Sequence, residues 1–204
     1  MSPGAFISVF GKFSKPQNGG HSGILQFAIG FQQVHLGFLA LVDVLGHGSE
    51  AHDVALIAQK YLEQNYCNEL VDVMQGLHAC LKGTRGAVAA ICRLDTKSGQ
   101  LIYVGVGNIT VRVLGPRASR FVSRDGIVGY MMKTPKEQTL KLFAGDVLVM
   151  YSDGIKEHFE LSESPGILTG TAKSIAVGLL NQFGKKNDDA SCIALRYLGD
   201  TDHD

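Results

Sequence analysis

Aspartates stand beside apolar, strand-like segments in three separate parts of the sequence. In one place the aspartate ends such a segment and is followed by a glycine-rich turn, GHG. In another the aspartate follows the segment VLVMYS and comes directly before a glycine. In the third, two neighbouring aspartates precede the segment ASCIAL. These residues are Asp43, Asp153, Asp188 and Asp189.

Carboxylates brought together without cations repel one another, so a cluster of these side chains would require bound cations. Oxygen ligands without paired His or Cys favour a hard ion, Mg²⁺ or Mn²⁺, over structural zinc. Two such ions about 3.5–4 Å apart can hold a bridging water, lower its pKa and neutralise a phosphoryl group during in-line attack. Each of these three aspartate-containing segments alone is more typical of a plain turn. The three segments together predict a two-metal hydrolytic centre.

Two further residues lie next to this acidic set. His47, in the glycine-rich turn, could protonate a leaving serine oxygen. The alternative, favoured for an isolated turn histidine, is an exposed side chain or a hydrogen-bonding neighbour of the ligands. Gly154 follows Asp153 and would let the backbone approach a ligand closely.

The segments around the aspartates have the patterns of strands and amphipathic helices. Apolar residues recur with helical spacing after Ser49, which we expect to be an N-cap, and again from Leu70 to Leu81, with Gly83 placed to end the helix. A third helix is predicted over about 171–183.

Strands are predicted for the remaining apolar segments. These are two within ILQFAIGFQQVHLGFLALVDV, with a turn near Gln32-Gln33, and then AVAAICRLD, QLIYVGVG, ITVRVL, QTLKLF, DVLVMYSD and ASCIALRYL. We expect Ala144-Gly145 to form a short hairpin connection between QTLKLF and DVLVMYSD. Because each helix has one apolar stripe to bury, the pattern predicts a layered α+β domain with helices on the sheet faces.

Composition limits the other possibilities. The chain has 204 residues, 19 basic and 19 acidic, so its formal net charge is zero and gives no electrostatic argument for nucleic acid or an acidic membrane surface. No segment approaches about 18 uninterrupted apolar residues and no signal peptide is recognisable, which predicts a soluble cytoplasmic protein. The four cysteines show no CxxC pairing, and we expect them to be buried and reduced. Oligomeric state is not encoded in any of these patterns.

The motifs of alternative chemistries are absent or have the wrong spacing. A cysteine phosphatase needs C-x5-R, but only four residues separate Cys80 from Arg85. No P-loop GxxxxGK[ST] and no GxSxG elbow is present. A GHKL-type ATPase needs DxGxG, and Leu45 takes the first glycine position.

Six ordered segments resemble motifs of one family. They are VDVLGHG, KGTRGAVAAI, YVGVGN, GIVGYM, SDGI and NDDAS. On these the sequence resembles the PPM family of metal-dependent serine/threonine phosphatases, in its SpoIIE-like branch and nearest to the RsbX-like members. The resemblance covers most of the chain and implies one domain, residues 1–204, with about 1–5 and 199–204 frayed. The implied fold is a four-layer αββα sandwich of two antiparallel β-sheets flanked by helices.

The resemblance also implies roles for particular residues. Asp43 would bridge two Mn²⁺ or Mg²⁺ ions, Asp153 and Asp188 would bind one of them, and Asp189 would lie just outside the ligands. The catalytic residues would then be Asp43, Asp153 and Asp188, and hydrolysis would proceed by direct attack of a metal-bridging hydroxide. RsbX-like enzymes act on phosphoserine or phosphothreonine in STAS-domain proteins of the stressosome, which would be the partners. Substrate-binding residues are not identified.

Three positions depart from the pattern of the family. Val44 stands where a glycine usually supplies a backbone carbonyl ligand, and the same role is expected of its carbonyl. His21 stands where the branch has aspartate, which predicts a weaker second metal site or a shift towards Mn²⁺. Asn108 stands where larger relatives have an aspartate linked to a third ion, so a third ion is not expected. These departures motivate the alternative function, a catalytically weak or inactive phosphatase-like module that docks signalling partners.

Overall fold

The structure is a computed structural model that describes residues 24–31, 36–156, 159, 166–185 and 188–199. The predicted turn at Gln32-Gln33, His21 and the frayed ends other than Gly199 lie outside the described residues. The elements, in chain order, are β1 (Ile24–Phe31), β2 (Leu36–Val44), α1 (Ser49–Asn65), α2 (Leu70–Cys80), β3 (Ala87–Asp95), β4 (Gln100–Val106), β5 (Thr110–Leu114), β6 (Ser119–Arg120), β7 (Gly126–Ile127), β8 (Met131–Met132), β9 (Gln138–Lys141), β10 (Val147–Tyr151), α3 (Ala172–Phe183) and β11 (Cys192–Arg196).

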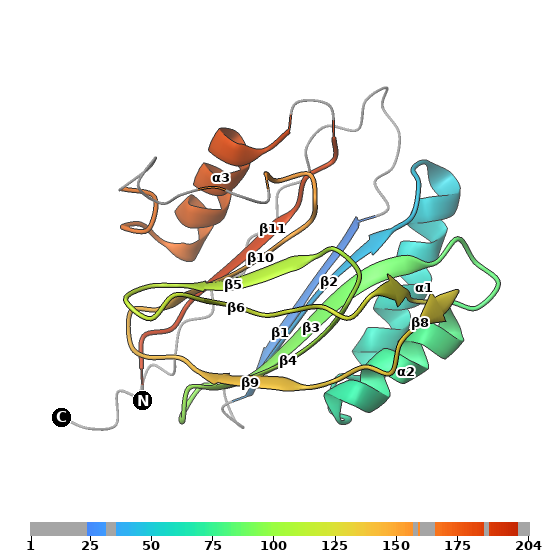
Figure 1. Ribbon diagram of the computed structural model, residues 1–204, viewed down its shortest axis with the longest axis horizontal. Helices are drawn as coiled ribbons and strands as arrows, with labels where there is room; N and C mark the ends of the chain where they lie inside the picture. Colours follow the sequence, from blue (N-terminus) through green and yellow to red (C-terminus); the bar gives the residue numbers. More distant parts are fainter. Residues whose placement is uncertain (1–23, 32–35, 157–158, 160–165, 186–187, 200–204) are drawn as a thin grey trace.

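Two antiparallel sheets are stacked between helices, as Figure 1 shows. The first sheet has the strand order β1-β2-β3-β4-β9, and the second has the order β11-β10-β5-β6. Helices α1 and α2 cover the outer face of the first sheet, and α3 covers the second sheet over β10 and β11. The predicted four-layer αββα sandwich is therefore confirmed.

Strand alternation explains the layers. In β2, Phe38, Ala40 and Val42 belong to the core beneath α1 and α2, whereas Leu39 and Leu41 belong to the core between the sheets. Successive side chains of a strand point to opposite faces, so a strand buried on both faces is a continuous apolar run. This is why the segment before Asp43 shows no polar alternation.

The prediction of a hairpin at Ala144-Gly145 was wrong. β9 pairs with β4 in the first sheet, whereas β10 pairs with β5 and β11 in the second, so this connection carries the chain from one sheet to the other. Buried Asp146 stabilises it, because its carboxylate accepts a hydrogen bond from the Phe143 N–H at 2.8 Å. A short turn between two apolar segments specifies a reversal of direction, and it does not specify the partner strand.

Two local predictions also needed correction. The N-cap of α1 is Gly48 rather than Ser49, and no side chain caps this end. By contrast, Thr171 caps α3, where its hydroxyl accepts a hydrogen bond from the Ser174 N–H. The α2 helix ends at Cys80, one residue before the last residue of the predicted helical pattern, and Gly83 follows in a left-handed turn.

The cysteines divide into two pairs. Cys92 and Cys192 are buried in strands as predicted, but Cys67 and Cys80 are exposed, at or beyond the ends of the helices. The apolar residues around them belong to the inner helical faces, and the cysteines lie off those faces. Within the described segments, no helix is long and apolar enough to cross a membrane.

Candidate active site

Asp43 occupies the end of β2 on the face that is turned toward the second sheet. It follows Leu39 and Leu41 in the strand alternation, and both of these pack in the core between the sheets. The next residue, Val44, points the other way and is buried in the core beneath α1 and α2. The burial of β2 therefore delivers one partly buried carboxylate to the edge of the sandwich.

The second and third acidic places lie on neighbouring strands of the second sheet. β10 ends at Tyr151, which pairs with Cys192 at the start of β11, so the residues that follow β10 lie beside those that precede β11. The Ser152 N–H donates to the Ser191 carbonyl at 3.1 Å, and the Ser191 N–H donates to the Ser152 hydroxyl oxygen at 3.1 Å. This ladder holds the Asp153 segment against the Asp188-Asp189 segment.

Gly154 is required by the close approach of these two segments. A Cβ atom at this position would lie 2.1 Å from the carbonyl oxygen of Asp189, which no side chain tolerates. The Gly154 carbonyl in turn accepts a hydrogen bond from the Lys185 N–H at 2.7 Å. Gly154 thus allows two acidic segments to approach each other, and its predicted close approach to a ligand stays a prediction.

Electrostatics show that the four carboxylates share one region. Burial, the largest cause, and the charges of Asp153, Asp188 and Asp189 together raise the pKa of Asp43 to about 7. Burial and the neighbouring Asp188 also raise the pKa of Asp189, while His47 opposes that rise. The exposed His47 therefore lies close to the acidic group.

Asn108 contacts the site directly. Its side-chain amide donates a hydrogen bond of 2.8 Å to Oδ2 of Asp153, across 45 residues of sequence. Asn108 lies in the connection between β4 and β5, which carries the chain from the first sheet to the second. The amide satisfies one hydrogen-bond acceptor of the Asp153 carboxylate, and it adds no further negative charge to the site.

The turn after Asp43 is held by Arg85, a contact that the sequence patterns did not reveal. Its guanidinium donates to the carbonyl oxygens of Leu45 and His47 at 3.4 and 3.5 Å, and it forms an ion pair of 2.7 Å with Glu50. A Cβ on Gly46, where φ is +87°, would lie 2.3 Å from Nη1 of Arg85. Arg85 belongs to the KGTRGAV segment, which resembles a family motif, but neither that motif nor the periodicity predicted this contact.

The donor set fits hard divalent cations. Among the described residues, no group of three or more His, Cys, Asp or Glu side chains is placed so that it could hold a metal ion. Mg²⁺ normally takes one or two carboxylates and completes its shell with waters and backbone carbonyls. Burial and, after it, the neighbouring carboxylates raise the pKa of Asp43, and a bound cation would relieve the repulsion among these carboxylates.

The valine at position 44 fits the strand. Val44 is in β2, opposite Ala87 of β3, and a β-branched residue suits this extended conformation. Its side chain lies on the helix-facing side, away from the face that carries Asp43. The replacement of the usual glycine therefore places no side chain in the acidic region.

A cavity of about 580 Å³ extends from Asp153 across the start of β5 to β6. The sequence analysis identified no substrate-binding residues, and most of the residues around this cavity carry no motif. The lining residues include Asn108, Thr110, Arg120, Tyr151, Asp153 and Lys185.

The chain resembles known phosphatases in sequence and in fold. Residues 37–198 match the family described as Stage II sporulation protein E (SpoIIE). The phosphoserine phosphatase RsbX of Bacillus subtilis (strain 168) is 28% identical over 143 residues, which are 66% of this chain and 71% of that protein.

Solved structures give the same result for the fold. A chain from "The bacterial stressosome: a modular system that has been adapted to control secondary messenger signaling" superposes with a TM-score of 0.84 and 29% identity, over 94% of this chain and 100% of that one. A crystal structure of RsbX in complex with magnesium gives a TM-score of 0.77 at 19% identity, over 94% of this chain and 99% of that chain.

Asp43, Asp153, Asp188 and Asp189 lie together at one edge of the sandwich, which we call the acidic edge. The sandwich and this acidic edge define a PP2C-type phosphatase domain. The chain belongs to the SpoIIE family, and it is an enzyme of the serine/threonine phosphatase class.

Proposed function

We propose that the chain is a divalent-metal-dependent phosphatase that hydrolyses phosphoserine and phosphothreonine in proteins. The observation that carries this proposal is the gathering of four carboxylates from three segments and both sheets, where burial and then the charges of its three neighbours raise the pKa of Asp43 to about 7. A protein gains nothing in stability from such crowding unless cations compensate it. We take residues 1–204 to be one phosphatase domain.

In this proposal the acidic residues hold Mn²⁺ or Mg²⁺. Asp43, Asp153, Asp188 and the backbone carbonyl of Val44 would hold these ions. Bound divalent ions lower the pKa of a water and neutralise the charge of the phosphoryl group during direct in-line hydrolysis. The similarity to RsbX, solved with magnesium, supports a divalent cation.

The neighbouring residues orient this set. Asn108 fixes one oxygen of Asp153 through its amide, which leaves the other oxygen to face a ligand. Asp189 lies beside the proposed ligands, and His47 is exposed and close enough to Asp189 to act on its pKa.

The natural substrates in this proposal are phosphorylated STAS-domain proteins of a stressosome, in the cytoplasm. The support is the similarity to RsbX and to a chain from a study of the bacterial stressosome. Incubating the chain with a serine-phosphorylated STAS domain, and separately with a phosphotyrosine peptide, tests this assignment. Release from the first and not the second is expected.

The experiment that tests the activity is phosphate release from p-nitrophenyl phosphate and a phosphoserine peptide with Mn²⁺, with Mg²⁺ and with EDTA. We expect release only with a metal, and loss of that release in Asp153→Asn, which removes one charge without changing side-chain size. Asp125→Asn is the matched control, since Asp125 is exposed and paired with Lys133. Release that persists in EDTA, or in Asp153→Asn, contradicts the proposal.

Calorimetric titration with Mn²⁺ measures the number of ions directly. Two ions per chain are expected in this proposal. A ratio of one ion per chain would mean that the second site, which the sequence places near His21, is not formed.

A further inference from the structure

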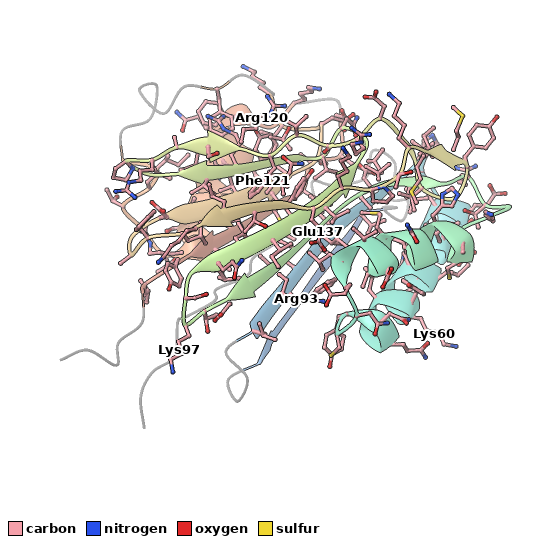
Figure 2. The ribbon with its side chains drawn as sticks, turned by 60° about the horizontal axis from the view of Figure 1, so that its bottom comes forward. Lys60, Arg93, Lys97, Arg120, Phe121 and Glu137 are labelled. Carbon is pink, nitrogen blue, oxygen red and sulfur yellow. The ribbon has the colours of Figure 1, made fainter. Side chains whose placement is uncertain are left out.

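The cavity beside Asp153 is lined by polar and basic groups along one side. It runs from Asp153 and Asn108, past Thr110, to Arg120 and Phe121 of the β6 segment, both labelled in Figure 2. Thr110 and Tyr151 are paired across β5 and β10, so their side chains share the outer face of the second sheet. The cavity therefore leads away from the acidic edge along that outer face.

The two basic residues of the lining come from different segments. Arg120 lies on β6, and its Nη2 atom is 3.5 Å from the Thr110 hydroxyl. Lys185 is exposed directly after α3, and its N–H donates to the Gly154 carbonyl, which keeps this residue next to Asp153. Asp153 is the single acidic residue of the lining among the described residues, so away from the metal ligands the cavity is cationic.

One of the residues that line the cavity, Tyr151, carries a buried hydroxyl. Tyr151 is 1% exposed, and its hydroxyl has no hydrogen-bond partner among the described residues. Its ring is held by Phe159, with the ring centroids 5.8 Å apart. A buried hydroxyl without a partner is unfavourable and is expected to gain one when a ligand or water occupies the space beside it.

We propose that this cavity, which we name the cationic subsite (Thr110, Arg120, Tyr151 and Lys185), binds a second anionic group of the substrate polypeptide near the phosphorylated residue. A guanidinium, an ammonium and two hydroxyls are the donors that recognise carboxylate or phosphate oxygens. The inference rests on the proposed phosphatase function, because it assumes that the phosphorylated residue itself lies at the acidic edge. The anion is either a Glu or Asp side chain or a second phosphate.

Three phosphoserine peptides of equal length distinguish these sources. They carry glutamates on both sides of the phosphoserine, or alanines at the same positions, or a second phosphoserine. We expect kcat/KM for the glutamate or the doubly phosphorylated peptide to exceed that of the alanine peptide by about three- to tenfold at low salt, and the preference to shrink as salt rises. The arm with the larger preference identifies the anion.

Variants of the lining test whether the subsite causes this preference. Arg120→Gln and Lys185→Gln are each expected to lower the ratio of acidic to neutral kcat/KM toward one, and Tyr151→Phe to lower it without removing the ring. Arg117→Gln is the matched control: Arg117 lies over the Phe143 ring, 4.1 Å from its centroid, and does not line the cavity. Equal ratios in the wild type and Arg120→Gln overturn the inference.

Failure of the proposed phosphatase function can be distinguished from failure of the cationic subsite. If no peptide and no p-nitrophenyl phosphate is hydrolysed with either metal, the phosphatase proposal fails. The subsite is then tested by fluorescence anisotropy of the labelled peptides with the EDTA-treated full chain. Tighter binding of the acidic peptides, lost in Arg120→Gln and kept in Arg117→Gln, supports the subsite, and equal binding of all peptides overturns it.

Discussion

The side-chain amide of Asn108 donates a 2.8 Å hydrogen bond to Oδ2 of Asp153, which joins the β4–β5 connection to the end of β10. Because these residues belong to segments that meet only through the fold, the bond links the two sheets at the acidic edge. It fixes one oxygen of a proposed metal ligand and thereby the direction of the other.

Asn108→Ala is expected to weaken Mn²⁺ binding by about tenfold, since partners of metal ligands typically contribute 10–100-fold to affinity or activity. Calorimetric titration with Mn²⁺ measures this change. Asn181→Ala, on the exposed surface of α3, is the control and should bind as the wild type does. An unchanged Mn²⁺ affinity in Asn108→Ala would show that the amide does not orient a ligand.

The metal-free protein should lose stability as pH rises. The pKa of Asp43 is about 7 in the folded state and near 3.8 when unfolded, so between these values the folded state holds a proton that the unfolded state has released. Its contribution to stability is complete below pH 3.8 and is lost as pH rises through 7. From pH 5 to 8 the loss is about 3 kcal/mol.

Urea unfolding in EDTA at several pH values, with the wild type and Asp43→Asn, measures this loss. The variant should lack the decline that Asp43 causes, so that the difference in unfolding free energy between the two proteins changes with pH. Mn²⁺ should stabilise the wild type more at pH 8 than at pH 5, because ion and proton compete for the same carboxylate. Parallel curves for both proteins would contradict the assignment.

The turn after Asp43 offers a matched pair of glycines. Gly46 and Gly48 both have φ near +88°, so alanine at either costs about 1–2 kcal/mol of backbone strain. Only at Gly46 would the added methyl collide with Arg85, whereas nothing lies within 4 Å of a Cβ at Gly48. Gly46→Ala is therefore expected to lower both unfolding free energy and phosphatase activity more than Gly48→Ala. Equal activities in the two variants would mean that Arg85 does not position the turn.

The cysteines should react in two classes. Cys67 and Cys80 are exposed, while burial raises the pKa of the Cys192 thiol to about 12 and that of Cys92 above its usual range. The thiolate is the reactive form, so a thiol reagent should label only the first two in the native protein. Mass spectrometry after labelling identifies them, and all four should react in urea. Rapid native labelling of Cys92 would contradict the burial of β3.

Much of the fold is visible in local patterns. Helical spacing predicted α1, α2 and α3, and apolar runs predicted most strands. Both patterns indicate how a single element is buried, and this burial depends on residues that are close together in the sequence. Periodicity does not indicate which carboxylates form one site, and the family motifs supplied this information. The proposed roles of these carboxylates stay predictions until metal binding is measured.

The sequence by itself determined the three helices, the longer strands, the family and the placing of aspartates at strand ends, because these depend on local burial and on short motifs. Only the tertiary structure decided that β9 and β10 lie in different sheets, that Arg85 holds the glycine turn, and that Arg120, Tyr151 and Lys185 line one cavity. The physical reason is that an apolar strand can pair with any complementary edge. Partner choice, and every contact that follows from it, is settled by the simultaneous burial of all the layers.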